Sequence, residues 1–399
     1  MATIVQRLLR TPGVRRLLNL SAFEALSLAE PIAWFLLTAP IFVFTLRQAP
    51  KLRWWLLPIN VFPAVQCYRT VDQLSTHLPG LDWLLAFTTL IYIIHSTSAL
   101  YIERWTLPAR PPGASPRWET TMAFKAWMNP RRLPLVDPTS SKATWTQRLI
   151  FALWRLVPLI VLGFIYVAVE LSLLLFLTPM PRDFGPPQQR YFHLGWGRAT
   201  VLRAAFSLHW AWLTYLILTA AHAALAILFV AVLQLDEPRE WPLLYGNPLN
   251  AYSIRRFWGS FWHRLGTESQ LRYGRLVSRE VLGLQPRGAS EKTFLAFWVF
   301  TISGVVHALV THKAEPEAGP LSDMWFLQLN FAGGLLELVL YRFGGRSRGR
   351  RVLQRGLGYL WLLLFFYCIV PPYQYPVLHK AAVRRMPFKV NMKMSPRSS

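Results

Sequence analysis

Long runs of apolar residues constrain this chain more than any other feature of its sequence. A transmembrane helix needs about 20 mostly apolar residues to cross the hydrocarbon core of a bilayer. Such runs occur at about 32–48, 53–70, 82–101, 149–178, 201–235, 294–310, 322–342 and 356–371. The sequence therefore predicts an all-α, polytopic membrane protein with about eight to nine transmembrane helices.

The composition supports this prediction. Apolar residues make up 53% of the 399 residues and aromatic residues 14%, whereas only 16% are charged. Soluble domains carry roughly 25% charged residues. The composition therefore argues against a disordered chain and against a single soluble domain.

The charged residues are strongly biased towards lysine and arginine, which give a formal net charge of +24. They are spread over the loops between the apolar runs, which argues against a nucleic-acid partner and favours anionic lipid headgroups or a phosphorylated cosubstrate. By the positive-inside rule, the loops 102–148 and 342–355 face the cytosol. Eight crossings then place two basic termini on the lumenal side, a conflict that one re-entrant segment would remove.

We predict one membrane domain over residues 1–399, with 102–148 as a proline-rich cytosolic insertion that carries a short helix near 119–128. Cys67 and Cys368 lie in apolar runs, and no paired-cysteine spacing indicates a disulfide framework or a metal site. No cleaved secretory signal is evident, so the first span is expected to serve as an uncleaved anchor. We expect an integral protein of the endoplasmic reticulum.

The first informative stretch is the basic and aromatic segment 247–265. Read as a helix with Ser253 as its N-cap, it has one apolar stripe. The stripe consists of Ile254, Phe257, Trp258, Phe261, Trp262 and Leu265, and the opposite face holds Arg255, Arg256, Gly259, Ser260 and His263. Such a helix would lie in the membrane interface, with its aromatic residues towards the acyl chains. By itself this pattern is also typical of a plain interfacial anchor.

The second informative stretch contains His307, deep in the apolar run 294–310. An ionisable side chain at that depth is costly and marks a functional candidate. Ser303 and Thr311 lie one turn away on the same face, and either hydroxyl could orient the imidazole. A histidine that is simply hydrogen-bonded between helices is the alternative. That structural role is what we expect for the other polar residues in apolar runs, namely His95, His209, His222, Glu170 and Glu337.

The two stretches together have a specific pattern. Asn-Pro-x-x-x-x-Ser-x-x-x-Phe-Trp-Gly-x-x-Trp-His begins at Asn247, and Ser-Gly-x-x-His ends at His307. This combination resembles the membrane-bound O-acyltransferase superfamily, in particular the plant wax synthase-like branch and its fungal relatives. The residues that carry the resemblance lie within about 240–345.

The resemblance implies roles for individual residues. His307 matches the intramembrane catalytic histidine, which acts as a general base on an acceptor hydroxyl that attacks an acyl-CoA thioester. His263 stands where sterol and diacylglycerol acyltransferases have an asparagine, so it is expected to stabilise the oxyanion or position the thioester. The expected acyl-CoA-binding residues are Arg255, Arg256, Arg264, Trp258, Trp262, Asn247, Asn250 and Ser303. Acyl-CoA is a cosubstrate, and no bound cofactor or metal is implied.

Two residues depart from the family pattern. Ser260 stands where the sterol and diacylglycerol branch has an acid, which fits another branch. Ala308 follows His307 where many wax synthase-like sequences have an acid, which leaves the orientation of His307 unexplained and leaves room for a member that has lost acyl transfer.

The resemblance favours acetyl transfer from acetyl-CoA to a hydroxyl of a hydrophobic alcohol, such as a terpenoid of secondary metabolism. Long-chain wax ester synthesis is the second reading. An isomerase or cyclase on the same fold, or a transporter, remains open. A transporter would predict internal symmetry between the two halves, which the sequence does not show. The oligomeric state is not predicted.

Overall fold

The computed structural model describes residues 21–78, 80–193, 195–314, 319, 321–343 and 351–384. Within these residues the regular structure is entirely helical. The chain divides into two compact units. Unit 1 comprises Met1–Ser140 and Leu265–Met324, and unit 2 comprises Ser141–Arg264 and Trp325–Ser399. The predicted motif region 240–345 is therefore shared between the two units.

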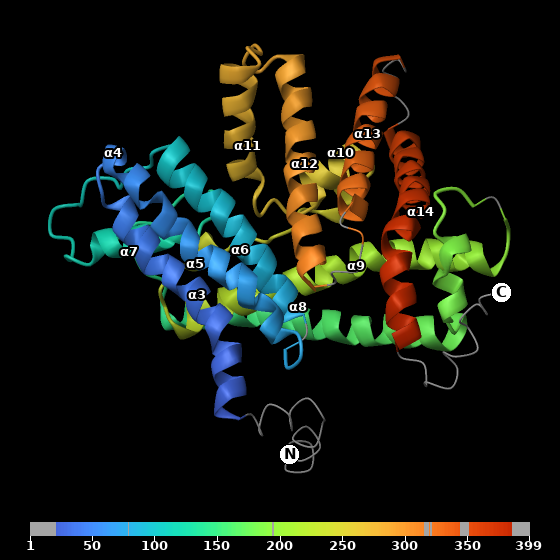
Figure 1. Ribbon diagram of the computed structural model, residues 1–399, viewed down its shortest axis with the longest axis horizontal. Coiled ribbons are helices and arrows are strands. Elements are labelled where there is room, and N and C mark those ends of the chain that lie inside the picture. The colour runs from blue at the N-terminus through green and yellow to red at the C-terminus, as the bar shows by residue number, and fades with distance from the viewer. Residues whose placement is uncertain are drawn as a thin grey trace, which may run out of the picture. The chain divides into compact units, whose positions relative to one another are not determined.

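Unit 1 is built from helices that pack side by side (Figure 1). Its helices are α3 (Ala22–Leu46), α4 (Pro50–Arg53), α5 (Leu57–Thr70), α6 (Leu81–Thr97), α7 (Trp118–Trp127), α11 (Thr267–Leu276), α12 (Ala289–Ala314) and the first turn of α13 (Leu321–Phe343). Ser21 starts α3 with a capping box, in which its hydroxyl accepts from the Glu24 backbone N–H. The core where α3, α5, α6 and α7 meet contains the buried alanines Ala64, Ala99 and Ala123, whose small side chains let helix backbones approach closely.

Unit 2 contains two long helices that run side by side, with α14 packed against one of them (Figure 1). They are α8 (Trp145–Ser172), which continues as the π-turn η4 (Leu173–Leu177), and α9 (Arg198–Ile227), which continues as the π-turn η7 (Leu228–Val232). The short α10 (Ile254–Arg256) continues as the π-turn η10 (Phe257–Phe261), and the unit is completed by the remainder of α13 and by α14 (Arg351–Arg384).

Buried arginines bind backbone carbonyl groups at the ends of helices in both units. In unit 1, Arg53 donates to the carbonyls of Leu46 and Trp105 at 2.8 and 2.6 Å. In unit 2, Arg148 donates to the Val230 carbonyl at 2.6 Å and to the Glu237 carboxylate at 2.7 Å. A planar guanidinium satisfies several carbonyls at once, which a lysine ammonium does less well. These arginines therefore have a structural role.

The fold prediction is confirmed as a polytopic helical membrane protein. Among the described residues, six helices are long and apolar enough to cross a membrane, at Glu24–Leu46, Leu81–Ile102, Trp145–Leu177, Arg198–Val232, Ala289–Lys313 and Leu353–Arg384. The predicted span at 53–70 is instead divided, because a 3-10 turn at Trp54–Leu56 precedes α5, whose 14 residues cover about 21 Å. Helix α13 occupies the predicted span at 322–342.

The insertion at 102–148 contains the predicted short helix, and α8 begins at Trp145, before its predicted end. Helix α7 begins at Trp118 and ends at Trp127, close to the expected 119–128, and its buried face packs against α3. Half of the basic loop predicted at 342–355 lies outside the described residues, because the structure does not describe 344–350.

Candidate active site

The first motif stretch of unit 2 forms a short helix, in which α10 continues directly into the π-turn η10 and ends at Phe261. Ser253 is the N-cap, as predicted, and accepts a hydrogen bond from the Arg256 backbone N–H at 3.2 Å. The Gly246 N–H donates to the Phe261 carbonyl at 2.8 Å. A Cβ atom on Gly246 would lie 2.0 Å from the Ser260 carbonyl oxygen, so only glycine allows this approach.

The predicted helix through Leu265 is wrong beyond Phe261. Trp262 adopts extended backbone angles, with φ −65° and ψ 151°. Because the Phe261 carbonyl is taken by Gly246, it does not accept a bond from a further turn of helix. His263 and Leu265 therefore follow the helix rather than belong to it.

The aromatic side chains of this stretch pack on protein, which corrects the prediction that they face acyl chains. Trp262 is buried and stacks on Trp210, with ring centroids 5.7 Å apart. Phe257 is also buried and meets Phe366 edge to face at 4.9 Å. Helices α9 and α14 supply these partners, because a large apolar surface near the membrane can be covered by other helices as well as by lipid.

Two polar residues of α13, Asn330 and Glu337, also bind this stretch. The Glu337 carboxylate accepts from the backbone N–H groups of Ile254 and Arg255 at 2.6 and 3.0 Å. It also accepts from the Trp361 indole N–H at 3.0 Å. The amide oxygen of Asn330, which is fully buried, accepts from the Trp258 indole at 2.9 Å. Glu337 thus satisfies the first free N–H groups of α10, the structural role expected for it.

The predicted acyl-CoA-binding residues of unit 2 differ in what surrounds them. Arg256 donates to the Asn250 carbonyl at 2.9 Å, and its guanidinium lies 4.4 Å from the centre of the Tyr252 ring. Asn247 is exposed, and its side chain accepts from the Leu249 N–H.

Arg255 and Arg264 are exposed, and His263 is half-buried beside the rings of Tyr245 and Trp262. Within the described residues, the Arg255 side chain makes no hydrogen bond or ion pair. Arg255 is therefore the arginine of this stretch that is most available to a ligand.

His307 lies in unit 1, on α12, where α13 begins. A Cβ atom on Gly304 would lie 3.2 Å from the Met324 Cα, so the glycine one turn before His307 lets the two helices approach closely. Asp323, adjacent to Met324, is only 2% exposed, and its charge acts on the His307 imidazole. Asp323 is thus a buried acid on the next helix whose charge reaches His307, whereas the residue after His307 is Ala308.

Phe87 contacts the His307 imidazole, whereas the Ser303 hydroxyl binds another residue. The Phe87 ring meets the imidazole edge to face, with centroids 4.7 Å apart. The Ser303 hydroxyl, expected to orient the imidazole or contact acyl-CoA, donates instead to the Gln270 side-chain oxygen at 3.3 Å. The Ser303 hydroxyl is therefore engaged by Gln270, whereas the Phe87 ring packs against the imidazole.

The other intramembrane histidines have partners inside their own units. His95 Nε2 lies 2.9 Å from the Ala126 carbonyl oxygen in unit 1. His209 Nε2 lies 2.6 Å from Glu170 Oε1 in unit 2, which joins α9 to α8. The ring of His222 packs against Trp241 at 5.3 Å. These contacts fit the structural roles predicted for the three histidines.

Sequence reasoning missed Asp323 and Asn330. With Glu337 they are spaced seven residues apart along α13, so all three lie near one face of that helix. Three polar residues at this spacing in an apolar run are a signal that the sequence contains. It was not recognised because each residue, taken singly, resembles an ordinary interruption of the run.

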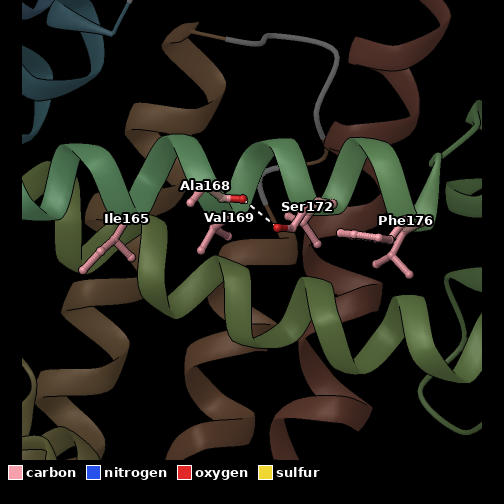
Figure 2. Close-up of a pocket in the computed structure, with 7 residues that line it drawn as sticks. Ile165, Ala168, Val169, Ser172 and Phe176 are labelled. Atoms are coloured by element: carbon pink, nitrogen blue, oxygen red, sulfur yellow. Dashed lines mark hydrogen bonds between the residues drawn. The ribbon is translucent and has the colours of Figure 1, made fainter.

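An apolar pocket in unit 2 is not the candidate site. Figure 2 shows that its labelled lining residues, Ile165, Ala168, Val169, Ser172 and Phe176, all come from α8 and its continuation η4. The Ser172 hydroxyl already donates to the Ala168 carbonyl at 2.7 Å. No titratable side chain lines this pocket, so it offers no acid or base. The described part of the chain also contains no group of three His, Cys, Asp or Glu residues that could hold a metal ion.

Comparison with known proteins confirms the resemblance. Residues 241–329 match the model of the membrane bound O-acyl transferase family. Acetyltransferase ataH of Aspergillus terreus is 32% identical over 172 residues, which cover 41% of this chain and 52% of that protein. Acetyltransferase eriL of Hericium erinaceus is 30% identical, and acetyltransferase nanB of Aspergillus nanangensis 26%, each over 44% of both chains. The matched regions span about half the length of these relatives, and no solved structure matches.

Proposed function

We propose that this membrane protein transfers an acyl group, most favourably acetyl, from acyl-CoA to a hydroxyl of a hydrophobic small molecule such as a terpenoid. The observation that carries the proposal is the arrangement of His307 on α12 beside the buried carboxylate of Asp323, within the region that matches the family model. The names of the similar proteins, all acetyltransferases, favour acetyl over longer chains. We also propose that it resides in the endoplasmic reticulum.

In the proposed mechanism His307 acts as the general base. Its neutral imidazole takes the proton of the acceptor hydroxyl as the oxygen attacks the thioester carbonyl carbon. The tetrahedral intermediate collapses with cleavage of the carbon–sulfur bond, and the imidazolium returns the proton to the departing CoA thiolate. The nearby Asp323 carboxylate stabilises the imidazolium that exists between these two steps. An ester and free CoA are the products.

The motif stretch of unit 2 supplies the proposed binding groups. His263 is proposed to donate to the oxyanion or to position the thioester, as the resemblance implies. Arg255 and Arg264, which are exposed, are proposed to pair with CoA phosphates, for which guanidinium geometry is well suited. Arg256 is proposed to contribute more by fixing the loop at Asn250 than by binding phosphate.

The test uses microsomes that contain the full chain, labelled acetyl-CoA and a panel of hydrophobic alcohols. Loss of a general base costs about 10²–10⁴ in rate, so His307→Ala should reduce ester formation by that factor. His312→Ala is the matched control, because His312 is exposed on the same helix and should leave the rate unchanged. Ester formation that survives His307→Ala would contradict the mechanism. Palmitoyl-CoA as the better donor would identify a wax ester synthase instead.

A further inference from the structure

A polar pocket of about 510 Å³ in unit 1 is lined by none of the residues assigned to catalysis. Its wall includes Glu103, Arg104, Trp105, Thr106, Asn129 and Arg132. Glu103 comes directly after the apolar helix that ends at Ile102. The pocket therefore lies where a membrane-spanning segment ends, at the level of the bilayer at which charged headgroups occur.

The one carboxylate of the pocket wall is already engaged by donors from the protein. Glu103 accepts from the Arg132 guanidinium at 2.7 Å, and Arg272 lies 3.3 Å away. The Ser98 hydroxyl and the Trp105 indole donate to the same carboxylate at 2.9 and 3.3 Å. Because the lone pairs of the Glu103 carboxylate are occupied, Glu103 positions Arg132 and Arg272 and does not attract a further cation.

Some N–H groups of the Arg132 guanidinium bind no acceptor within the described residues. Its side chain is 8% exposed and lies over the Trp105 ring, with the guanidinium carbon 4.0 Å from the ring centre. Its Nη1 group is buried and has no hydrogen-bond partner within the described residues. Burial lowers the pKa of this guanidinium to about 10, and the charges of Glu103 and Glu268 oppose that shift. Arg132 nevertheless stays charged at neutral pH.

Arg104 supplies a second positive charge. Its side chain is exposed and makes no hydrogen bond or ion pair in the part of the chain that the structure describes. The three arginines Arg104, Arg132 and Arg272 therefore outnumber the two carboxylates near them. The surplus is a positive charge on the wall of a pocket.

Both pocket arginines are held in strained backbone. Arg104 has φ +51° and Arg132 has φ +58°, in the left-handed region that non-glycine residues rarely occupy. For Arg132 the cause is a clamp, in which the Asn129 side chain binds both the N–H and the carbonyl of Leu133 at 2.8 and 2.6 Å. Strain of this kind collects at binding sites, where the surrounding structure imposes it.

We infer that this pocket binds a phosphate group, carried either by an anionic phospholipid headgroup or by a soluble phosphorylated compound such as coenzyme A. Arg104 and the spare donors of Arg132 would bind the phosphate oxygens by charge-assisted hydrogen bonds. The inference does not depend on the proposed acyl transfer, because binding is measured without turnover.

The test measures ligand-induced shifts of the thermal unfolding midpoint of the purified full chain in non-ionic detergent. The ligands are phosphatidic acid and coenzyme A, with phosphatidylcholine as the zwitterionic control. The decisive variant is Arg104→Gly, because glycine adopts φ +51° without strain and should not impair folding. Its apparent Kd for the stabilising ligand should rise about tenfold. Arg104→Lys should retain part of the affinity.

Arg117→Gln is the charge-matched control, since Arg117 is exposed in the same insertion and does not line the pocket. Its affinity should equal that of the unchanged protein. Stabilisation by phosphatidic acid alone would assign the pocket to lipid, and stabilisation by coenzyme A alone would assign it to a soluble compound. The inference is overturned if neither ligand stabilises the protein, or if Arg104→Gly binds as tightly as the unchanged chain.

Discussion

The two motif stretches use their polar residues in opposite ways. In unit 2, Glu337 and Asn330 are occupied by backbone N–H groups and an indole, so they serve to fix the Phe-Trp-Gly turn. In unit 1, the buried charge of Asp323 acts on a second ionisable side chain, His307. A carboxylate that binds backbone donors builds a structure, whereas a carboxylate that acts on an imidazole can tune a proton transfer.

This contrast separates two kinds of intramembrane acid that look alike in a sequence. Both Asp323 and Glu337 lie on α13, and both interrupt an apolar run. Substitution at Asp323 should therefore act mainly on the rate of ester formation. Substitution at Glu337 should act mainly on the stability of the fold.

The largest expected effect is that of Asp323→Asn on turnover. Without the carboxylate charge, the imidazolium of His307 loses its stabilising partner, and kcat for acetyl transfer should fall about a hundredfold, within the range of a general-base contribution. The KM for acyl-CoA should change little, because Asp323 is buried beside His307 and not among the binding residues. Steady-state kinetics in detergent or microsomes measures both quantities.

Asp72→Asn is the matched control for that variant. Asp72 is an exposed acid of the same unit that pairs with Lys313 at 2.9 Å, an interaction worth about 0–1 kcal/mol. It should leave kcat unchanged. A folded Asp323→Asn protein with normal kcat would show that Asp323 takes no part in the mechanism. It would also contradict the contrast between Asp323 and Glu337.

The second prediction concerns stability. Glu337→Ala removes the acceptor of three donors, so the free energy of unfolding should decrease by about 2–4 kcal/mol. Glu337→Gln retains one acceptor oxygen and should cost about half as much. Unfolding midpoints in detergent measure both changes. The free energy of unfolding of His307→Ala should lie within about 1 kcal/mol of that of the unchanged protein. An equal loss of stability in His307→Ala and Glu337→Ala would refute the distinction between the two stretches.

The smallest expected effect distinguishes two neighbouring arginines within unit 2. Arg255→Ala should raise the apparent KM for acyl-CoA about three- to tenfold, because its exposed guanidinium is available to a phosphate. Arg256→Ala should raise the KM less and lower the unfolding midpoint instead, because Arg256 binds the Asn250 carbonyl and stacks on Tyr252. An unchanged KM in both variants would exclude this stretch from CoA binding.

Much of the fold follows from the sequence, because membrane spans are read directly from apolar length. The helix near 119–128 and the Ser253 N-cap were also predictable from local pattern. The end of the motif helix at Phe261 was not. It depends on a hydrogen bond from Gly246, fifteen residues earlier, and no local periodicity reports such a contact.

The residues of the candidate site also differ in whether the sequence alone identifies them. His307 was identified because an ionisable residue in an apolar run is conspicuous. Asp323 was not, because it becomes relevant only where α13 packs against Gly304, a contact between two helices. The polar pocket at Arg104 and Arg132 was equally hidden, since the two arginines lie 28 positions apart and read as ordinary basic loop residues.

The buried arginine at the start of α8 also has a consequence for the time during which the chain is made. Arg148 finds its carboxylate partner in Glu237, 89 residues later in the chain. At about 5–20 residues per second, the ribosome needs on the order of 4–18 seconds to reach that partner. During this interval the Arg148 guanidinium, in the first turn of α8, lacks its carboxylate partner. A long arginine side chain at a helix end can reach the aqueous boundary meanwhile. The position of Arg148 thus allows α8 to enter the bilayer before the remainder of unit 2 is made.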